Sequence, residues 1–358
     1  MRAAQKRHTV TTTNDTPPLL EQYLAHLDQQ KNRHGHPLSK ETIRATISDM
    51  RGFIGWWEQA KRLTFDPSLV LDRDLVNWQI HRQKVDGVQP STINRANATL
   101  RGFFGWAERT HWSKHNPAAD LHDRPVPEVA PRSIPPDGID WLVRIASDEA
   151  DQKTRLRDLA LLTLLHDCGL RRQEASDAQL RDLDLAAGTV IVRDGKGGIP
   201  GRVLLTANAV RRLRDYLRVR VPNGLPAIGS EAEREPLLER HAVTVARQPW
   251  LPGMPTEAIR WRLGDLGRTA AGKIREQAKK EPSIERVGQL LALADKLEKA
   301  TPHQLRHGLA YRLRKSGKDA AYIQRALRHS RPSTSLKYGK PTDDDVRAAL
   351  EESEQAGR

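Results

Sequence analysis

Four short stretches in the second half of the chain contain side chains able to work on a phosphate ester. They are "GLRRQE" at 169–174, "DGKGG" at 194–198, "TPHQLRH" at 301–307 and "LRHSRPSTSLKYG" at 327–339. Their chemistry-bearing residues are Arg171, Glu174, Lys196, His303, Arg306, His307, His329 and Tyr338.

Together these side chains fit the cleavage of a phosphodiester by a protein nucleophile. Two arginines can hold the non-bridging oxygens of a phosphate and neutralise the charge that develops in a pentavalent transition state. Histidines can donate hydrogen bonds or transfer protons near neutral pH, and a lysine can protonate the departing alkoxide. A tyrosine hydroxyl, with a pKa of about 10, becomes a nucleophile when a base and nearby cations assist it. Because guanidinium groups take the Lewis-acid part, we expect no metal and no other cofactor.

Each stretch also has a purely structural interpretation. Arg171 and Glu174 could form an ordinary i,i+3 helix pair, and Lys196 could be a solubilising turn residue. The two histidines of "TPHQLRH" have the i,i+4 spacing of a zinc helix. However, Gln304 stands where the H-E-x-x-H motif has glutamate, and no third ligand is evident.

The chain is strongly basic. Its 358 residues carry a formal net charge of +14, which favours a polyanionic partner. Cys168 is the only cysteine, which excludes an intrachain disulfide and fits a reducing compartment. No apolar run reaches the roughly 20 residues that span a bilayer, and residues 1–18 lack the apolar core of a signal peptide. We therefore expect a cytoplasmic protein.

The first third of the chain shows helical periodicity and no alternating strand pattern. Helices are predicted at 19–31, 39–60, 72–84 and 91–109, with Ser39 and Ser91 as N-caps. An Arg-Gly-Phe-x-Gly-Trp pattern recurs in the second and fourth helices and predicts an aromatic core between them. The aromatic residues are Phe53, Trp56, Phe103 and Trp106. The arginines Arg44, Arg51, Arg95 and Arg101 are expected to be exposed, facing either DNA phosphates or only solvent.

Five prolines at 122–138 indicate a linker, and the pattern changes after it. A buried helix at 158–167 is predicted to end before Gly169, and residues 187–206 alternate as a small β-hairpin. Helices are then expected at 208–218, 257–280, 284–299, 303–315 and 319–328. The helix at 284–299 has an apolar stripe typical of core packing, with a protomer–protomer contact as the alternative. The stripe comprises Ile284, Val287, Leu290, Leu291, Ala294 and Leu297.

In this order and spacing, the four stretches resemble the motifs of the tyrosine recombinase (phage integrase) family. The family's first box falls on "GLRRQE", with Asp182 as its closing aspartate, and its hairpin lysine falls on Lys196. The T-P-H-x-L-R-H box is present unbroken. In the last box, L-G-H-S followed by tyrosine, Tyr338 follows His329 by nine positions, and Arg328 replaces the glycine.

The resemblance implies a mainly α protein with a small β-sheet in its catalytic domain, built as a two-domain C-shaped DNA clamp. The expected parts are a flexible basic arm at 1–16, a helical core-binding (SAM-like) domain at 17–122 and a linker at 123–134. A catalytic domain at 135–340 and a tail helix at 341–358 follow. Residues 240–300 are longer than the family usually has there. The tail helix, with Val346, Ala349 and Leu350 on one side, is expected to dock on a neighbouring protomer, with packing on its own chain as the alternative.

The implied activity is site-specific recombination of duplex DNA through a 3′-phosphotyrosyl intermediate, without metal or ATP, in the bacterial cytoplasm. The resemblance implies a homotetramer on paired recombination sites, a monomer or weak dimer when free, and an accessory DNA-bending or directionality protein as a further partner. The implied catalytic residues are Arg171, Lys196, His303, Arg306, His329 and Tyr338, supported by Glu174, Asp182 and His307. A type IB topoisomerase-like nicking–closing enzyme and a non-catalytic DNA-binding relative are the alternatives.

Overall fold

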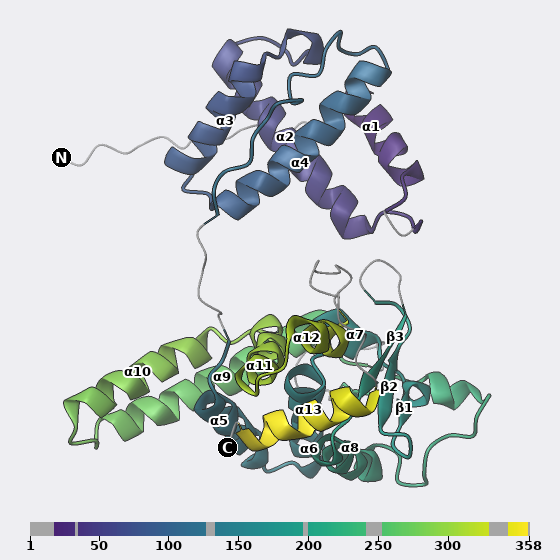
Figure 1. The fold of residues 1–358 in the computed structure, drawn as a ribbon, viewed down its shortest axis with the longest axis vertical. Coiled ribbons are helices and arrows are strands. Elements are labelled where there is room, and N and C mark those ends of the chain that lie inside the picture. The colour runs from purple at the N-terminus through teal and green to yellow at the C-terminus, as the bar shows by residue number, and fades with distance from the viewer. Residues whose placement is uncertain are drawn as a thin grey trace, which may run out of the picture. The chain divides into compact units, whose positions relative to one another are not determined.

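The computed structural model describes residues 18–32, 35–126, 133–195, 200–240, 253–328 and 343–356 (Figure 1). The chain divides into two compact units, Met1–Glu128 and Val129–Arg358, and each has its own apolar core. The fold is mainly α-helical with one small antiparallel sheet, as the sequence predicts. No helix in the described ranges is both long and apolar enough to cross a membrane. The expected arm at 1–16 lies outside those ranges.

In the described part of the first unit, four helices lie close to the predicted ranges. They are α1 (Pro18–Gln29), α2 (Lys40–Lys61), α3 (Asp72–Lys84) and α4 (Pro90–Arg109). Ser39 caps α2, and its hydroxyl accepts a hydrogen bond from the Thr42 N–H at 3.2 Å. The predicted cap at Ser91 is wrong, because Gln89 is the N-cap of α4 and Pro90 begins the helix. Proline suits the first helical position, where its missing N–H costs nothing and its fixed φ is already helical.

The predicted aromatic core is confirmed. Phe53 and Phe103 are fully buried, and Trp106 is buried beside them. Phe53 meets Phe104 edge-on, with ring centroids 6.0 Å apart, which joins α2 to α4. Trp56 is only partly buried at the margin of this core. These contacts hold the helices of the first unit together.

The second unit begins with α5 (Pro136–Ser147), which the sequence analysis missed, and α6 (Gln152–Leu162). Helix α6 continues into a π-helical turn, Thr163–Asp167, so the buried helix predicted at 158–167 starts earlier than expected. The helical segment ends before Gly169, where φ is +63° and an added Cβ would lie 2.8 Å from Leu309 and 2.9 Å from Leu327. Only glycine fits this left-handed and crowded position, from which the chain continues into α7 (Arg172–Asp177).

The small sheet follows α7. Strands β2 (Thr189–Val192) and β3 (Gly201–Leu204) pair antiparallel, with Val190 opposite Val203, as the predicted hairpin requires. A third strand that was not predicted, β1 (Leu183–Asp184), pairs with β2. The turn residues 196–199 lie outside the described ranges.

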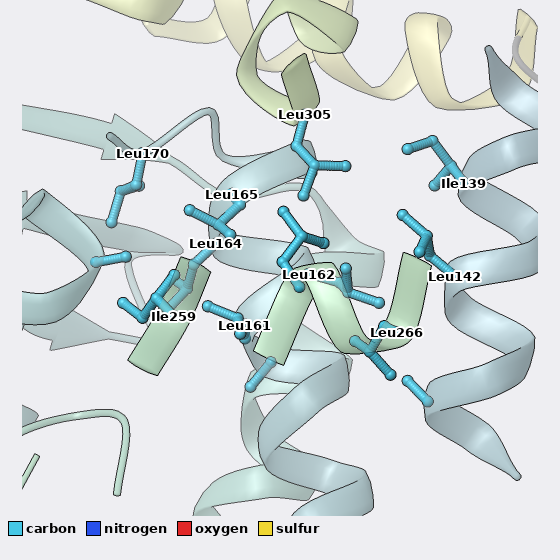
Figure 2. Packing of buried hydrophobic residues seen from close by; sticks show 14 of the residues in the cluster. Ile139, Leu142, Leu161, Leu162, Leu164, Leu165, Leu170, Ile259, Leu266 and Leu305 are labelled. Atoms are coloured by element: carbon cyan, nitrogen blue, oxygen red, sulfur yellow. The ribbon is translucent and has the colours of Figure 1, made fainter. Parts of the chain in front are cut away.

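Six further helices follow in the described part of the second unit. They are α8 (Ala207–Arg220), α9 (Thr256–Ala278), α10 (Ile284–Glu298), α11 (Pro302–Lys315), α12 (Ala320–Leu327) and α13 (Asp343–Ala356). Figure 2 shows the centre of the core, where leucines of α6 and the π-helical turn meet side chains of α5, α9 and α11. The labelled residues are Ile139, Leu142, Leu161, Leu162, Leu164, Leu165, Leu170, Ile259, Leu266 and Leu305. The segment leading to Arg171 is therefore anchored in the middle of the unit.

Helix α10 fits the predicted stripe only in part. Leu290, Ala294 and Leu297 are buried against the unit, whereas Ile284 is 90% exposed and Leu291 is also exposed. Helices α9 and α10 form a hairpin that projects from the unit (Figure 1), so the first turn of α10 lies beyond the core. The core interpretation therefore holds for Leu290, Ala294 and Leu297 and is wrong for Ile284 and Leu291.

Helix α13 packs on its own chain, so the expected docking on a neighbour is not what this structure shows. Val346, Ala349 and Leu350 are buried in a cluster with residues of β3, α11 and α12. The Thr206 hydroxyl donates to Glu354 Oε1 at 2.6 Å, which fixes the end of the helix beside α8.

Candidate active site

Glu174 is the centre of a cluster of arginines. Its side chain is 2% exposed and lies in the first turn of α7, where Arg171 is the N-cap. The Arg171 backbone N–H donates to Glu174 Oε2 at 2.8 Å, and Arg171 Nη1 donates to Oε1 at 2.6 Å. One carboxylate therefore fixes both the start of α7 and the direction of the Arg171 guanidinium, which is 27% exposed.

Arg306 approaches the same carboxylate from α11. Its side chain is 4% exposed, and Nη1 lies 3.8 Å from Glu174 Oε2. Arg306 donates to the carbonyl oxygens of Gly169 and Leu327. These hydrogen bonds connect the segment before α7 to the end of α12. Burial, and then the charge of Arg171, lower the pKa of Arg306 to about 9, so the guanidinium remains charged at neutral pH.

Arg328 is the third arginine of this cluster. In the sequence it stood out only as a departure from the family pattern. Arg328 Nη2 donates to Glu174 Oε2 at 2.6 Å, and the Arg328 side chain is 13% exposed. The signal was visible in the sequence as an arginine where the family's last box has glycine. Its partner could not be inferred, because Glu174 lies 154 residues earlier.

The start of α11 positions two exposed histidines. Thr301 and Gln304 form a capping box, in which the Gln304 side chain accepts the Thr301 N–H at 2.8 Å, so Gln304 has a structural task of its own. The rings of His303 and His307 are 4.2 Å apart, between centroids. Burial, and then the charges of His307, Arg306 and Arg171, lower the pKa of His303, so its imidazole is neutral near pH 7 and can donate or accept one proton.

Asp182 supports the sheet next to this cluster. It is buried and accepts hydrogen bonds from Arg193 Nε at 3.0 Å and from the Gln179 N–H at 2.8 Å. Arg193 directly follows β2, three residues before Lys196, so Asp182 fixes the strand end from which that turn departs. Lys196, His329 and Tyr338 lie outside the described residues.

The four arginines of the first unit that were predicted to face DNA phosphates or solvent divide into two kinds. Arg44 and Arg51 are exposed on α2, as expected. Arg95 makes two hydrogen bonds to Asp49, at 2.5 and 2.9 Å, although half of its side chain is exposed. Arg101 is partly buried and donates to Leu121 O and to Asp123, so it is less exposed than expected, and its contact with DNA phosphate stays a prediction.

Acid should weaken the arginine cluster. Burial alone would raise the pKa of Glu174, but Arg328 and the hydrogen bonds from Arg171 and Arg328 outweigh burial and lower it. The folded state therefore binds fewer protons than the unfolded state. This stabilisation is complete above the ordinary carboxyl pKa of about 4.3 and is lost as the pH falls through the lowered folded value.

We expect the difference in unfolding free energy between the natural chain and Glu174→Gln to shrink as the pH falls from about 6 to about 3. Urea titrations at several pH values measure this difference. A difference that stays constant over that range would contradict the pKa assignment.

Comparison with known proteins identifies the family. Residues 133–344, more than half of the chain, match the Phage integrase family. The tyrosine recombinase XerC of Rhodospirillum centenum is 31% identical over 323 residues, covering 88% of this chain and 81% of that protein. The tyrosine recombinase XerD of Listeria innocua is 27% identical, covering 84% of this chain and 88% of that protein.

Two solved structures share the fold. The Tn1549 transposon integrase in complex with transposon right end DNA has a TM-score of 0.59 at 19% identity, covering 92% of this chain and 98% of that chain. A lambda integrase dimer bound to a COC′ core site has a TM-score of 0.55 at 12% identity, covering 91% and 98%. The chain belongs to the phage integrase family and is a tyrosine-type site-specific DNA recombinase.

Proposed function

We propose that Tyr338 is the nucleophile of this recombinase and that the arginine cluster around Glu174 binds the phosphate it attacks. One observation carries the proposal. Arg171 and Arg306 come from segments more than a hundred residues apart, and both guanidinium groups lie against the same buried carboxylate. Two cations held this close leave a net positive charge beside one carboxylate, which favours the phosphate oxygens as a further anionic partner.

The proposed reaction is a transesterification. The Tyr338 oxygen forms a bond to phosphorus while the bond from phosphorus to the 5′ oxygen breaks, leaving a 3′-phosphotyrosyl link and a free 5′-hydroxyl. Lys196 gives a proton to the departing oxygen, and His303 and His329 assist by hydrogen bonding and proton transfer. Arg171 and Arg306 stabilise the charge that develops on the phosphate oxygens. Attack by a 5′-hydroxyl reverses these steps and rejoins the strand, so the phosphoester energy is conserved without ATP.

The supporting residues have separate tasks in this proposal. Glu174 orients Arg171, Asp182 fixes the strand end that precedes Lys196, and His307 orders the His303 ring. Each of these tasks rests on a contact described above: the Arg171–Glu174 pair, the Arg193–Asp182 pair and the edge-to-face contact of the two imidazoles.

The partner we propose is duplex DNA with paired recombination sites, bound by four copies of the chain. The net charge of +14 and the exposed Arg44 and Arg51 on α2 support binding to a phosphate backbone. Arg95 can contact phosphate with the exposed half of its side chain while Asp49 fixes its direction. An accessory DNA-bending or directionality protein would act on the same assembly.

The test is covalent capture. The chain is incubated with nicked duplexes tiled across the DNA that encodes and flanks its gene, and the products are separated under denaturing conditions. We expect a protein–DNA adduct, and peptide mapping of the adduct should locate the attachment at Tyr338. Attachment at a different residue, or no adduct on any duplex, would refute the proposal.

A further inference from the structure

Arg328 occupies a backbone position that disfavours an arginine. It is the C-cap of α12 and has φ +53° and ψ +48°, the left-handed conformation in which a side chain normally meets the following carbonyl. Glycine is the usual residue at such a helix end, and the family's last box has glycine here. A non-glycine residue in this conformation carries a strain cost that the surrounding structure has to offset.

Two contacts hold the Arg328 side chain. Its Nη2 donates to Glu174 Oε2 at 2.6 Å, the oxygen that also accepts the Arg171 backbone N–H. Its aliphatic stem passes over Gly201 at the start of β3, where an added Cβ would lie 2.9 Å from Arg328 Cδ. Any larger residue at 201 would push the stem away, so Gly201 leaves the space that allows Arg328 to reach Glu174.

The cluster therefore links three parts of the unit through one carboxylate. Arg171 starts α7, Arg306 extends from α11, and Arg328 ends α12 directly before His329 in the sequence. Arg328 is more enclosed than Arg171, with 13% of its side chain exposed against 27%. Its Nη2 donates to that carboxylate, which connects the end of α12 to Glu174.

We propose that Arg328 is a positioning residue for strand cleavage. It fixes the end of α12 to the carboxylate that holds Arg171, so one ion cluster sets both the phosphate-binding guanidinium and the start of the segment that carries His329 and Tyr338. This inference rests on the proposed function of Tyr338 and Arg171.

The test compares single-turnover cleavage and DNA affinity on the tiled nicked duplexes. Arg328→Gly restores an unstrained left-handed residue but removes the bond to Glu174, so we expect cleavage at saturating DNA to slow by about tenfold with little change in DNA affinity. Arg328→Lys keeps a cation near Glu174 and should recover part of the rate. Arg218→Ala removes the same charge from an exposed position on α8 and should cleave normally.

A double-mutant cycle tests whether the effect passes through the described contacts. Gly201→Ala should slow cleavage in the natural chain and should have little effect when Arg328 is already glycine. Glu174→Gln combined with Arg328→Gly should be no slower than Glu174→Gln alone. Additive effects, or full-rate cleavage by Arg328→Gly, would overturn the positioning role while leaving the proposed function intact. A natural chain that forms no adduct on any duplex would refute the proposed function, and the role of Arg328 with it.

Discussion

Replacing Tyr338 with phenylalanine is expected to abolish covalent attachment of the protein to DNA while leaving DNA binding intact. The substitution removes one oxygen, and that oxygen is the proposed nucleophile. The arginines that attract the phosphate keep their charge and their carboxylate partner. We expect adduct formation to fall by at least about 10⁴-fold, the scale seen when a nucleophile is deleted from an enzyme that retains its other groups. Denaturing gels measure the adduct, and band shifts under native conditions measure binding.

The other tyrosines make weaker nucleophiles or serve as controls. Tyr23 and Tyr216 are buried, and burial raises the pKa of each to about 12, which holds the phenol in its unreactive form. Tyr311 is 45% exposed on α11, the helix that carries His303 and Arg306, so Tyr311→Phe is the matched control. If Tyr311→Phe lost the adduct and Tyr338→Phe kept it, Tyr311 on α11 would be the nucleophile.

Helical periodicity predicted most of the fold because apolar spacing directly reflects which side faces the core. It failed where distant parts of the chain decide the outcome. Helix α5 begins with Pro136, the last of the five prolines that indicated a linker, and β1 is only two residues long and exists through its pairing with β2. Ile284 has the spacing of a core residue, but it lies at the projecting end of the α9–α10 hairpin, where the described residues leave it exposed.

For the candidate site, too, the sequence did not predict the contacts between distant segments. The types and spacing of Arg171, Glu174 and Arg306 could be read from the sequence, since short motifs carry them. The sequence could not show that Arg328 shares the Glu174 carboxylate or that Gly201 makes room for it, because these contacts join segments far apart in the chain. Arg101 likewise looked fully exposed, yet it is partly buried and makes hydrogen bonds to Asp123 and to a main-chain carbonyl.

Replacing Arg306 with alanine is expected to remove cleavage activity and also to destabilise the protein. The cleavage rate should fall by at least about 10³-fold, because a positive charge beside the proposed phosphate site is lost and Arg171 loses a neighbour that shares its carboxylate. The carbonyls of Gly169 and Leu327 lose their buried donor, and Glu174 loses part of its compensation. Breaking such a buried cluster costs about 3 kcal/mol of unfolding free energy.

Arg312→Ala separates the two effects, because Arg312 is the structural counterpart of Arg306 on α11. It donates to the carbonyl of His166 at 3.2 Å and lies 3.5 Å from the buried Asp167, so its loss also breaks a buried ion pair and frees a carbonyl. Both variants should melt at lower temperature than the natural chain. If the arginine cluster around Glu174 is the reacting site, the cleavage rate per folded molecule will fall in Arg306→Ala and stay unchanged in Arg312→Ala. Equal losses of cleavage in the two variants, in proportion to stability, would mean that Arg306 acts on folding alone.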